Sequence, residues 1–153
     1  MRLSTIPFLL FSVETFFVGE YTYYVLAEAA NFKDSEKMCR ENKAEFASFE
    51  NENEQKVFDQ VLQSHPSNSY GIGYYIPPHG HGKWENARWA GGADSSYVKD
   101  NKLIYKLNDK QCSRRAFNNN RIYSYNCDLT TYKYMCKKKG ICILYFVHTR
   151  KPV

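Results

Sequence analysis

The spacing of hydrophobic and polar residues changes once along the chain, from helical periodicity to the alternation that is typical of strands. The run Tyr21–Leu26 is rich in Tyr and Val and predicts a strand. Asn31 is placed to cap a helix with one inward face, formed by Phe32, Ser35, Cys39 and Asn42. A second helix is predicted over Asn51–Gln63, on an apolar stripe formed by Val57, Phe58, Val61 and Leu62.

The second half of the chain predicts strands alone. Tyr70–Ile76 alternates as a strand does, and Pro77 and Pro78 end it. No helical spacing is found after this point. Further short strands are expected between clusters of Gly, Asn and Asp, over Lys83–Trp89, Lys102–Leu107, Cys112–Phe117, Arg121–Tyr125 and Thr131–Lys137. A strand, two helices and then many short strands with long loops predict an α+β domain.

Length and charge narrow the classes of function. A chain of 153 residues corresponds to one domain, which excludes an enzyme with separate cofactor and substrate domains. The net charge is +5, but it is uneven: 5 basic and 10 acidic residues lie between Glu20 and Asp59, whereas 11 basic and 3 acidic residues lie between Lys99 and Lys139. This polarised charge differs from a uniform basic coat, so we expect no nucleic-acid partner.

The first residues resemble a secretory leader. Arg2 is followed by a mostly apolar run, Leu3–Val18, and cleavage after Gly19 would define a signal peptide over residues 1–19. The run is shorter than the roughly 20 residues that cross a bilayer, so a membrane anchor is the weaker alternative, beside a wrongly assigned first exon. We therefore expect a secreted, extracellular protein without a membrane span.

Five cysteines indicate disulfides rather than a metal site. None of them forms the Cys-x-x-Cys pair of a zinc knuckle or a redox couple, and secretion would permit disulfide formation. Spacing alone does not decide how they pair. The five residues are Cys39, Cys112, Cys127, Cys136 and Cys142.

Taken together, the order of elements and several short motifs resemble the C-type lectin-like domain, over Tyr21–Lys139. The stretch Phe32–Cys39 is similar to the family's first helix, which ends in its first cysteine. Other matching segments are Ala44–Phe49 for "x-x-Leu-Ala-Ser-Ile", Gly71–Tyr74 for "Trp-Ile-Gly-Leu" with Gly71 in place of Trp, Gly82–Trp84 for Gly-x-Trp, and Tyr134–Cys136 for "Tyr-Ile-Cys". The resemblance implies a C-type lectin-like fold over residues 20–139, followed by a tail over residues 140–153.

The resemblance also implies a cysteine pairing, Cys39 with Cys136 and Cys112 with Cys127. Cys142 is then left over, within the uncharged run Ile141–Val147. Such a run has high β-propensity and needs cover. Pairing with a second chain would make a homodimer through Cys142; packing on the edge of its own sheet, or a disordered or wrongly assigned tail, are the alternatives.

Sugar-binding members of that family hold Ca²⁺ with carboxylate and amide oxygens. Their Glu-Pro-Asn or Gln-Pro-Asp motif is missing, because the chain has no proline between His79 and Lys151, and Ile122-Tyr123-Ser124 stands where they have Trp-Asn-Asp. We therefore expect no cofactor and no Ca²⁺ at the usual site. Acidic and amide residues of the loop Ala90–Gln111, and the pair His79 and His81, are interpreted as solvated loop residues rather than as metal ligands.

The leading hypothesis is a recognition module, not an enzyme, that binds a glycan or a protein through its long loop. Candidate ligand-binding residues are Tyr97, Lys99, Lys102 and Arg121, because aromatic rings stack on sugars and cations pair with anionic groups. One alternative is a small secreted hydrolase, although its candidate bases all fall in expected loops or in the tail: His65, His79, His81 and His148. Another is a structural, venom-like subunit linked through Cys142.

Overall fold

The computed structural model describes residues 15–64, 69–106, 111–115, 121–129, 131–140 and 150–152. Its helices are α1 (Phe32–Glu41), α2 (Glu52–Ser64), α3 (Ser96–Asp100) and the 3-10 helix η3 (Trp84–Asn86). Its strands are β1 (Thr15–Val18), β2 (Tyr21–Val25), β3 (Glu45–Phe46), β4 (Tyr70–Tyr75), β5 (Arg88–Trp89), β6 (Ile104–Lys106), β7 (Cys112–Arg115), β8 (Ile122–Tyr125), β9 (Lys133–Lys139) and β10 (Arg150–Pro152). The predicted α+β class is confirmed.

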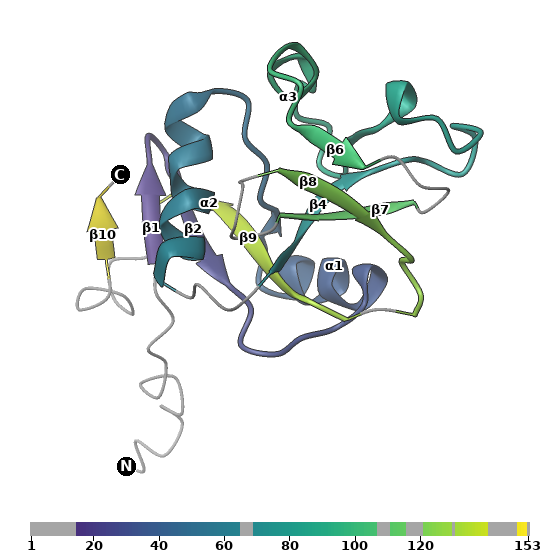
Figure 1. The fold of residues 1–153 in the computed structure, drawn as a ribbon. Helices are drawn as coiled ribbons and strands as arrows, with labels where there is room; N and C mark the ends of the chain where they lie inside the picture. Colours follow the sequence, from purple (N-terminus) through teal and green to yellow (C-terminus); the bar gives the residue numbers. More distant parts are fainter. Residues whose placement is uncertain are drawn as a thin grey trace.

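One twisted sheet runs through the molecule in the order β10-β1-β2-β9-β4-β7-β8-β6, with β3 on β9 and β5 on β4 as side branches (Figure 1). Most neighbours are antiparallel, but β4 and β9, β6 and β8, and β1 and β10 run parallel. Because β4 and β9 are far apart in sequence, their pairing joins the two halves of the chain.

Local sequence explains both predicted helices, which the structure confirms. The side chain of Asn31 caps α1, since its Oδ1 accepts a hydrogen bond from Asp34 N at 2.8 Å. At the start of α2, Asn51 Oδ1 accepts from Glu54 N at 3.0 Å, while Glu54 Oε2 accepts from Glu50 N at 2.7 Å. These reciprocal bonds satisfy backbone N–H groups that the first turn leaves open.

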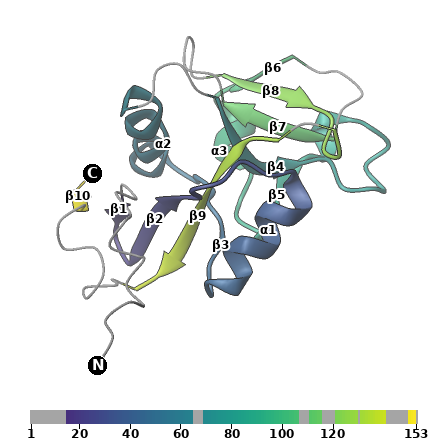
Figure 2. The same ribbon diagram turned by 90° about the horizontal axis from the view of Figure 1, so that it is seen from below.

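The two faces of the sheet bury two hydrophobic clusters. Figures 1 and 2 show α1 and α2 on different sides of the strands. The larger cluster lies with α2 and includes Phe49, Trp84 and Trp89; Trp84 is thus a core residue, as its place in the Gly-x-Trp motif implies. The smaller cluster lies with α1 and includes Phe46 and Tyr134, whose rings stack with centroids 4.8 Å apart.

Two disulfides join elements that are distant in sequence, in the pairing that the resemblance implies. Cys39 of α1 bonds Cys136 of β9, with Cα atoms 5.7 Å apart, at a sequence separation of 97. Cys112 of β7 bonds Cys127, which follows β8. In the chain-entropy model, the first bond stabilises the fold by roughly 4–5 kcal/mol.

The expectation that no helix follows Ile76 is wrong. The short helix α3 lies inside the loop region, and the expected strand Lys83–Trp89 divides into η3 and the two-residue strand β5. The physical reason is length: elements of two to five residues are too short for a period of 3.6 or 2.0 to be visible in sequence.

The ends of the chain also join the sheet. β1 lies within the predicted leader, yet it pairs with β2 from Thr15↔Tyr24 to Val18↔Tyr21, and Phe16 is only 1% exposed within the larger cluster. From the tail, β10 pairs with β1 in parallel. Cys142 and the whole run Ile141–Val147 lie outside the described residues, so the covalent dimer stays a prediction, as does the leader itself.

No helix among the described residues has both the length and the apolar character needed to cross a membrane.

Gly71 shows why the family's Trp is replaced in this chain. A Cβ atom at Gly71 would lie 2.3 Å from Cζ of Tyr134, because the Tyr134 ring packs directly on the glycine backbone. The two residues are register partners in β4 and β9. Tyr134 therefore fills the space that a larger side chain on β4 would need.

We predict that Phe16→Ala lowers the free energy of unfolding by about 3–5 kcal/mol, because it empties a fully buried ring position. A chain that begins at Glu20 should lose at least as much relative to one that begins at Thr15. Urea denaturation of the oxidised proteins measures both. Equal stability of the two chain lengths would show that β1 contributes nothing to the folded domain.

We also predict that Gly71→Ala costs about 1–3 kcal/mol, since the new methyl group must displace the Tyr134 ring. Adding Tyr134→Leu should recover part of that loss, because the smaller side chain frees the space. Thermal and urea unfolding of the two variants and of Tyr134→Leu alone form a double-mutant cycle. Simple additivity of the two substitutions would contradict this account of the contact.

Candidate functional site

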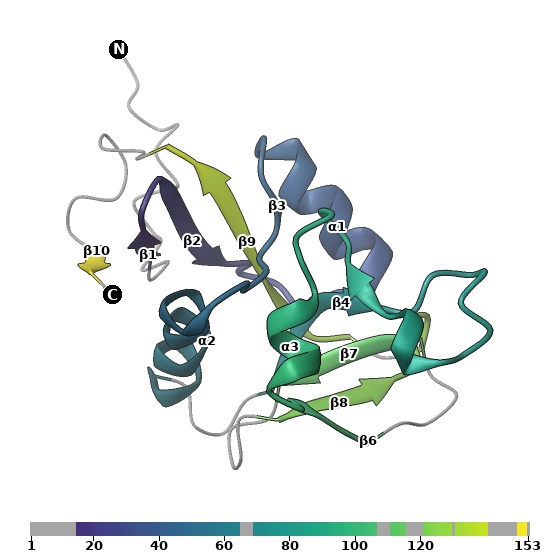
Figure 3. The ribbon, with the colours of Figure 1, turned by 90° about the horizontal axis from the view of Figure 1, so that it is seen from above.

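The candidate site is built by the loop that leaves β5, forms α3 and continues into β6. Figure 3 shows α3 beside β7 and β8, with β6 along the outer edge. Leu103 N donates to Val98 O at 3.2 Å, which folds the chain back after α3. Ile122 N then donates to Leu103 O at 2.9 Å, which joins the start of β6 to β8. These backbone bonds bring three segments to one edge of the sheet.

Three of the four predicted ligand residues lie at this edge: Lys99 at the end of α3, Lys102 in the following turn and Arg121 just before β8. All three are exposed. Lys99 Nζ donates to Glu85 O at 3.0 Å, and Lys102 has a positive φ of 50° in the turn. We call these three residues the cationic edge. Its members come from two segments, the end of α3 with its following turn and the start of β8, and the pairing of β6 with β8 brings these segments together.

Tyr97, the fourth predicted ligand residue, points toward α2 instead. Its hydroxyl donates to Gln55 Oε1 at 2.7 Å, and its ring packs edge-on against Phe49, with centroids 6.2 Å apart. Burial, together with the nearby carboxylates of Glu52 and Asp59, raises the pKa of Tyr97, so the hydroxyl stays protonated as a donor. The structure therefore gives Tyr97 a structural role, anchoring α3 to α2.

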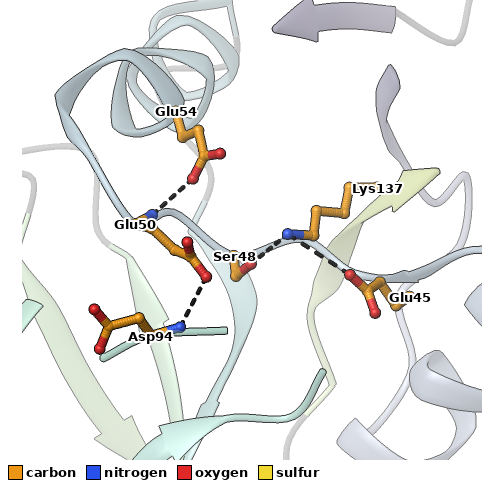
Figure 4. Close-up of polar contacts among 6 residues, drawn as sticks. All are labelled: Glu45, Ser48, Glu50, Glu54, Asp94 and Lys137. Atoms are coloured by element: carbon orange, nitrogen blue, oxygen red, sulfur yellow. Dashed lines mark hydrogen bonds and ion pairs between the residues drawn. The ribbon is translucent and has the colours of Figure 1, made fainter. Parts of the chain in front are cut away.

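A line of polar contacts fixes the start of this loop to the segment between α1 and α2 (Figure 4). Glu50 Oε1 accepts from Asp94 N at 2.8 Å, across the gap between the two segments. Asp94 Oδ1 in turn accepts from Ser96 N at 3.0 Å and from Ser96 Oγ at 2.8 Å. The backbone bond from Ser96, then the hydroxyl bond, lower the pKa of the Asp94 carboxyl.

The same segment is held to the sheet by a buried lysine. Lys137 of β9 donates from Nζ to Ser48 Oγ at 2.8 Å and pairs with Glu45 Oε1 at 3.6 Å (Figure 4). Its ammonium also lies 4.8 Å from the centre of the Tyr21 ring. These contacts explain how a charged side chain is tolerated at a buried position. The loop is thus attached to a rigid support.

Carboxylates of the loop serve the backbone rather than a cation. The part of the chain that the structure describes contains no group of three His, Cys, Asp or Glu residues that could hold a metal ion. His79 and His81 are exposed. Within the expected acidic and amide set, Asn101 Nδ2 donates back to Tyr97 O at 2.8 Å. Asn108 and Asp109, like His65 and His148, lie outside the described residues.

At the family's Trp-Asn-Asp position, the structure places an arginine against tyrosines. Ile122 is fully buried in the larger cluster, whereas Tyr123 faces the other side of β8. The guanidinium of Arg114 lies over the rings of Tyr123 and Tyr132, with Cζ 5.1 and 5.8 Å from their centroids. Sequence reasoning missed Arg114, because only the register Arg114↔Tyr123 between β7 and β8 reveals the pair.

Comparison with known proteins bears on this arrangement. The family model described as the Lectin C-type domain matches residues 28–138. No curated protein sequence matches the chain significantly.

Many solved structures share the fold at low sequence identity. The C-type lectin domain of murine dendritic cell inhibitory receptor 2, solved with an N-glycan, is 17% identical, with a TM-score of 0.68 and coverage of 83% of this chain and 97% of that chain. Human lithostathine is 16% identical, with a TM-score of 0.68 and coverage of 83% and 89%. A calcium-independent type II antifreeze protein is 18% identical, with a TM-score of 0.66 and coverage of 84% and 93%.

The contacts of Tyr97 allow a test of whether this residue stabilises the fold or binds a ligand. Tyr97→Phe removes the hydroxyl bond to Gln55 and should lower the free energy of unfolding by about 0.5–1.5 kcal/mol. Lys102→Ala, in an exposed turn, serves as the matched control. Urea titration measures both variants. A Tyr97→Phe protein as stable as wild type would return this residue to the candidates for ligand binding.

Proposed function

Because the chain belongs to the C-type lectin domain family, whose model matches residues 28–138, we propose that it is a secreted, Ca²⁺-independent recognition module for anionic glycans. Its ligand surface is the cationic edge of Lys99, Lys102 and Arg121. The ligand carries sulfate or carboxylate groups. A family member of this kind acts by binding and has no catalytic role.

The observation that carries this proposal is that three exposed cations, from two segments distant in sequence, lie on one edge of the sheet. Asp100 and Glu85 also lie near this edge, and the cations remain in excess. Arg presents a planar fork of donors and Lys a compact charge, and both pair with sulfate or carboxylate oxygens. Because the edge is exposed, such pairing is weakened by salt.

Two features favour binding without Ca²⁺. Ile122 lies in the core, and Tyr123 and Ser124 carry no carboxylate where the sugar-binding relatives have Trp-Asn-Asp. Ca²⁺ requires six to eight oxygen ligands, several of them usually carboxylates. The Asp94 carboxylate is already bonded to Ser96. The cationic edge supplies positive charge by its own side chains, which is the role that a bound cation would have toward an anionic sugar.

Secretion is supported by the two disulfides. Cystines persist in oxidising compartments and are rare in the cytosol. Both bonds join core elements, since Cys39, Cys112 and Cys136 are fully buried in the smaller cluster. A fold that depends on these bonds belongs in the secretory pathway.

We predict that the protein binds sulfated or sialylated glycans on an array, equally well in EDTA and in millimolar Ca²⁺. The double variant Lys102→Glu/Arg121→Glu should bind at least tenfold more weakly, because two attractive charges become repulsive. Lys33→Glu is the matched control, since it makes one charge reversal on α1, at an exposed position. Array binding at two salt concentrations measures the effect.

Loss of binding in EDTA, or undiminished binding by the double variant, would contradict the proposal. The melting temperature provides an independent check on Ca²⁺. An ion that binds the native state stabilises it by RT ln(1 + [L]/Kd), about 2.7 kcal/mol at a hundredfold excess over Kd. We expect no shift of that size in millimolar Ca²⁺.

A further inference from the structure

Arg114 is held in one position by neutral groups. Its Nη1 donates to Ser69 Oγ at 2.8 Å, and its guanidinium lies between the rings of Tyr123 and Tyr132. Tyr132 is itself packed edge-on against Tyr125, with centroids 4.9 Å apart. An arginine fixed in this way has already lost much of its side-chain freedom, so a ligand that pairs with it loses less entropy on binding.

Two other arginines of the described segments have carboxylate partners that Arg114 lacks. Arg40 pairs with Glu36 along α1, and the buried Arg115 pairs with Asp59 of α2 at 2.6 Å. Among the described residues, none offers a carboxylate to Arg114. Two aromatic rings partly shield this half-buried guanidinium from water, which strengthens its attraction for an anion that approaches. Within the described part of the chain, this guanidinium therefore has no anionic partner and can pair with an oxyanion of a ligand.

An exposed leucine lies in the turn between β8 and Tyr132, one of the two rings that contact Arg114. Leu129 is 83% exposed. Among the described residues, it is the one large hydrophobic side chain that is exposed. Asn126 Oδ1 accepts from Leu129 N at 3.3 Å, and the Cys112–Cys127 bond ties this turn to β7. Tyr132 is three positions after Leu129, so their Cα atoms lie within about 11 Å of each other.

We propose that Ser69, Arg114, Tyr123, Leu129 and Tyr132 form a second binding surface, whose partner is a protein segment. The segment places a carboxylate against Arg114 and covers Leu129 with apolar side chains. Tyr and Arg are the residues that most often dominate protein interfaces. A glycan fits less well, because Leu129 offers a sugar no hydrogen bond.

The charges around the surface define the partner further. Asp128 is exposed beside Leu129 and would repel a run of acidic residues. The best segment therefore has a single Asp or Glu flanked by aliphatic or aromatic residues. Arg121 lies two positions before Tyr123 and just before β8, so this surface adjoins the cationic edge but uses different residues. The inference does not rest on glycan binding.

Random dodecapeptides displayed on phage, panned on the whole oxidised protein, test the proposal. We expect enrichment of peptides with one carboxylate beside apolar residues. Synthetic copies should bind at least tenfold more weakly to Arg114→Lys, which keeps the charge but loses the planar fork, and to Leu129→Ser. Arg88→Lys, an exposed arginine on β5, is the matched control. Calorimetric titration gives each Kd.

Several results would overturn the proposal: no enriched peptide, enriched peptides without a carboxylate, or binding that neither variant weakens. Glycan binding that depends on Arg114, without peptide binding, would reassign the surface to carbohydrate. Leu129→Ser changes an exposed turn and keeps the test valid if Arg114→Lys folds poorly. Lys102→Glu/Arg121→Glu should retain peptide binding, which separates failure here from failure of the proposed glycan site.

Discussion

The pairing of β9 with β2, β3 and β4 is the constraint on which the rest of the structure depends. This strand comes late in the sequence, yet in the sheet it lies between the N-terminal strands and the strands that carry the candidate site. Cys136 bonds α1 on one face of it, and Lys137 reaches Ser48 and Glu45. Without β9, the two halves of the sheet would have no direct contact, and both hydrophobic clusters would open.

Buried charges reinforce this arrangement. Lys137 and Arg115 are both buried, and each satisfies its charge with a partner from the first half of the chain. Burial lowers the pKa of Arg115, an effect that Asp59 opposes. Removing one partner would leave a charge in a poorly solvated place, which is far more costly than losing a surface ion pair. Such pairs therefore favour one register of β7 and β9 over others.

Much of the fold could be predicted from the sequence, because α1 and α2 are long enough to show a period and the cysteines have recognisable spacing. α3 could not, since a helix of five residues is too short to show a period. The range predicted for the leader includes β1, because an apolar strand and an apolar leader have the same composition. The exposed cations of the candidate site can be predicted from their residue type alone. The roles of Tyr97 and Arg114 cannot, because they depend on contacts between segments that only the folded chain brings together.

The position of the two chain ends has a consequence for how the protein can present its ligand surfaces. β10 and β1 form one edge of the sheet, and β6, next to the cationic edge, forms the other. A second module joined directly to β1 or to β10 would therefore be attached far from the cationic edge. Several copies joined in this way could face a multivalent surface together, and their avidity would rise through effective concentration without any change in the single-site contacts.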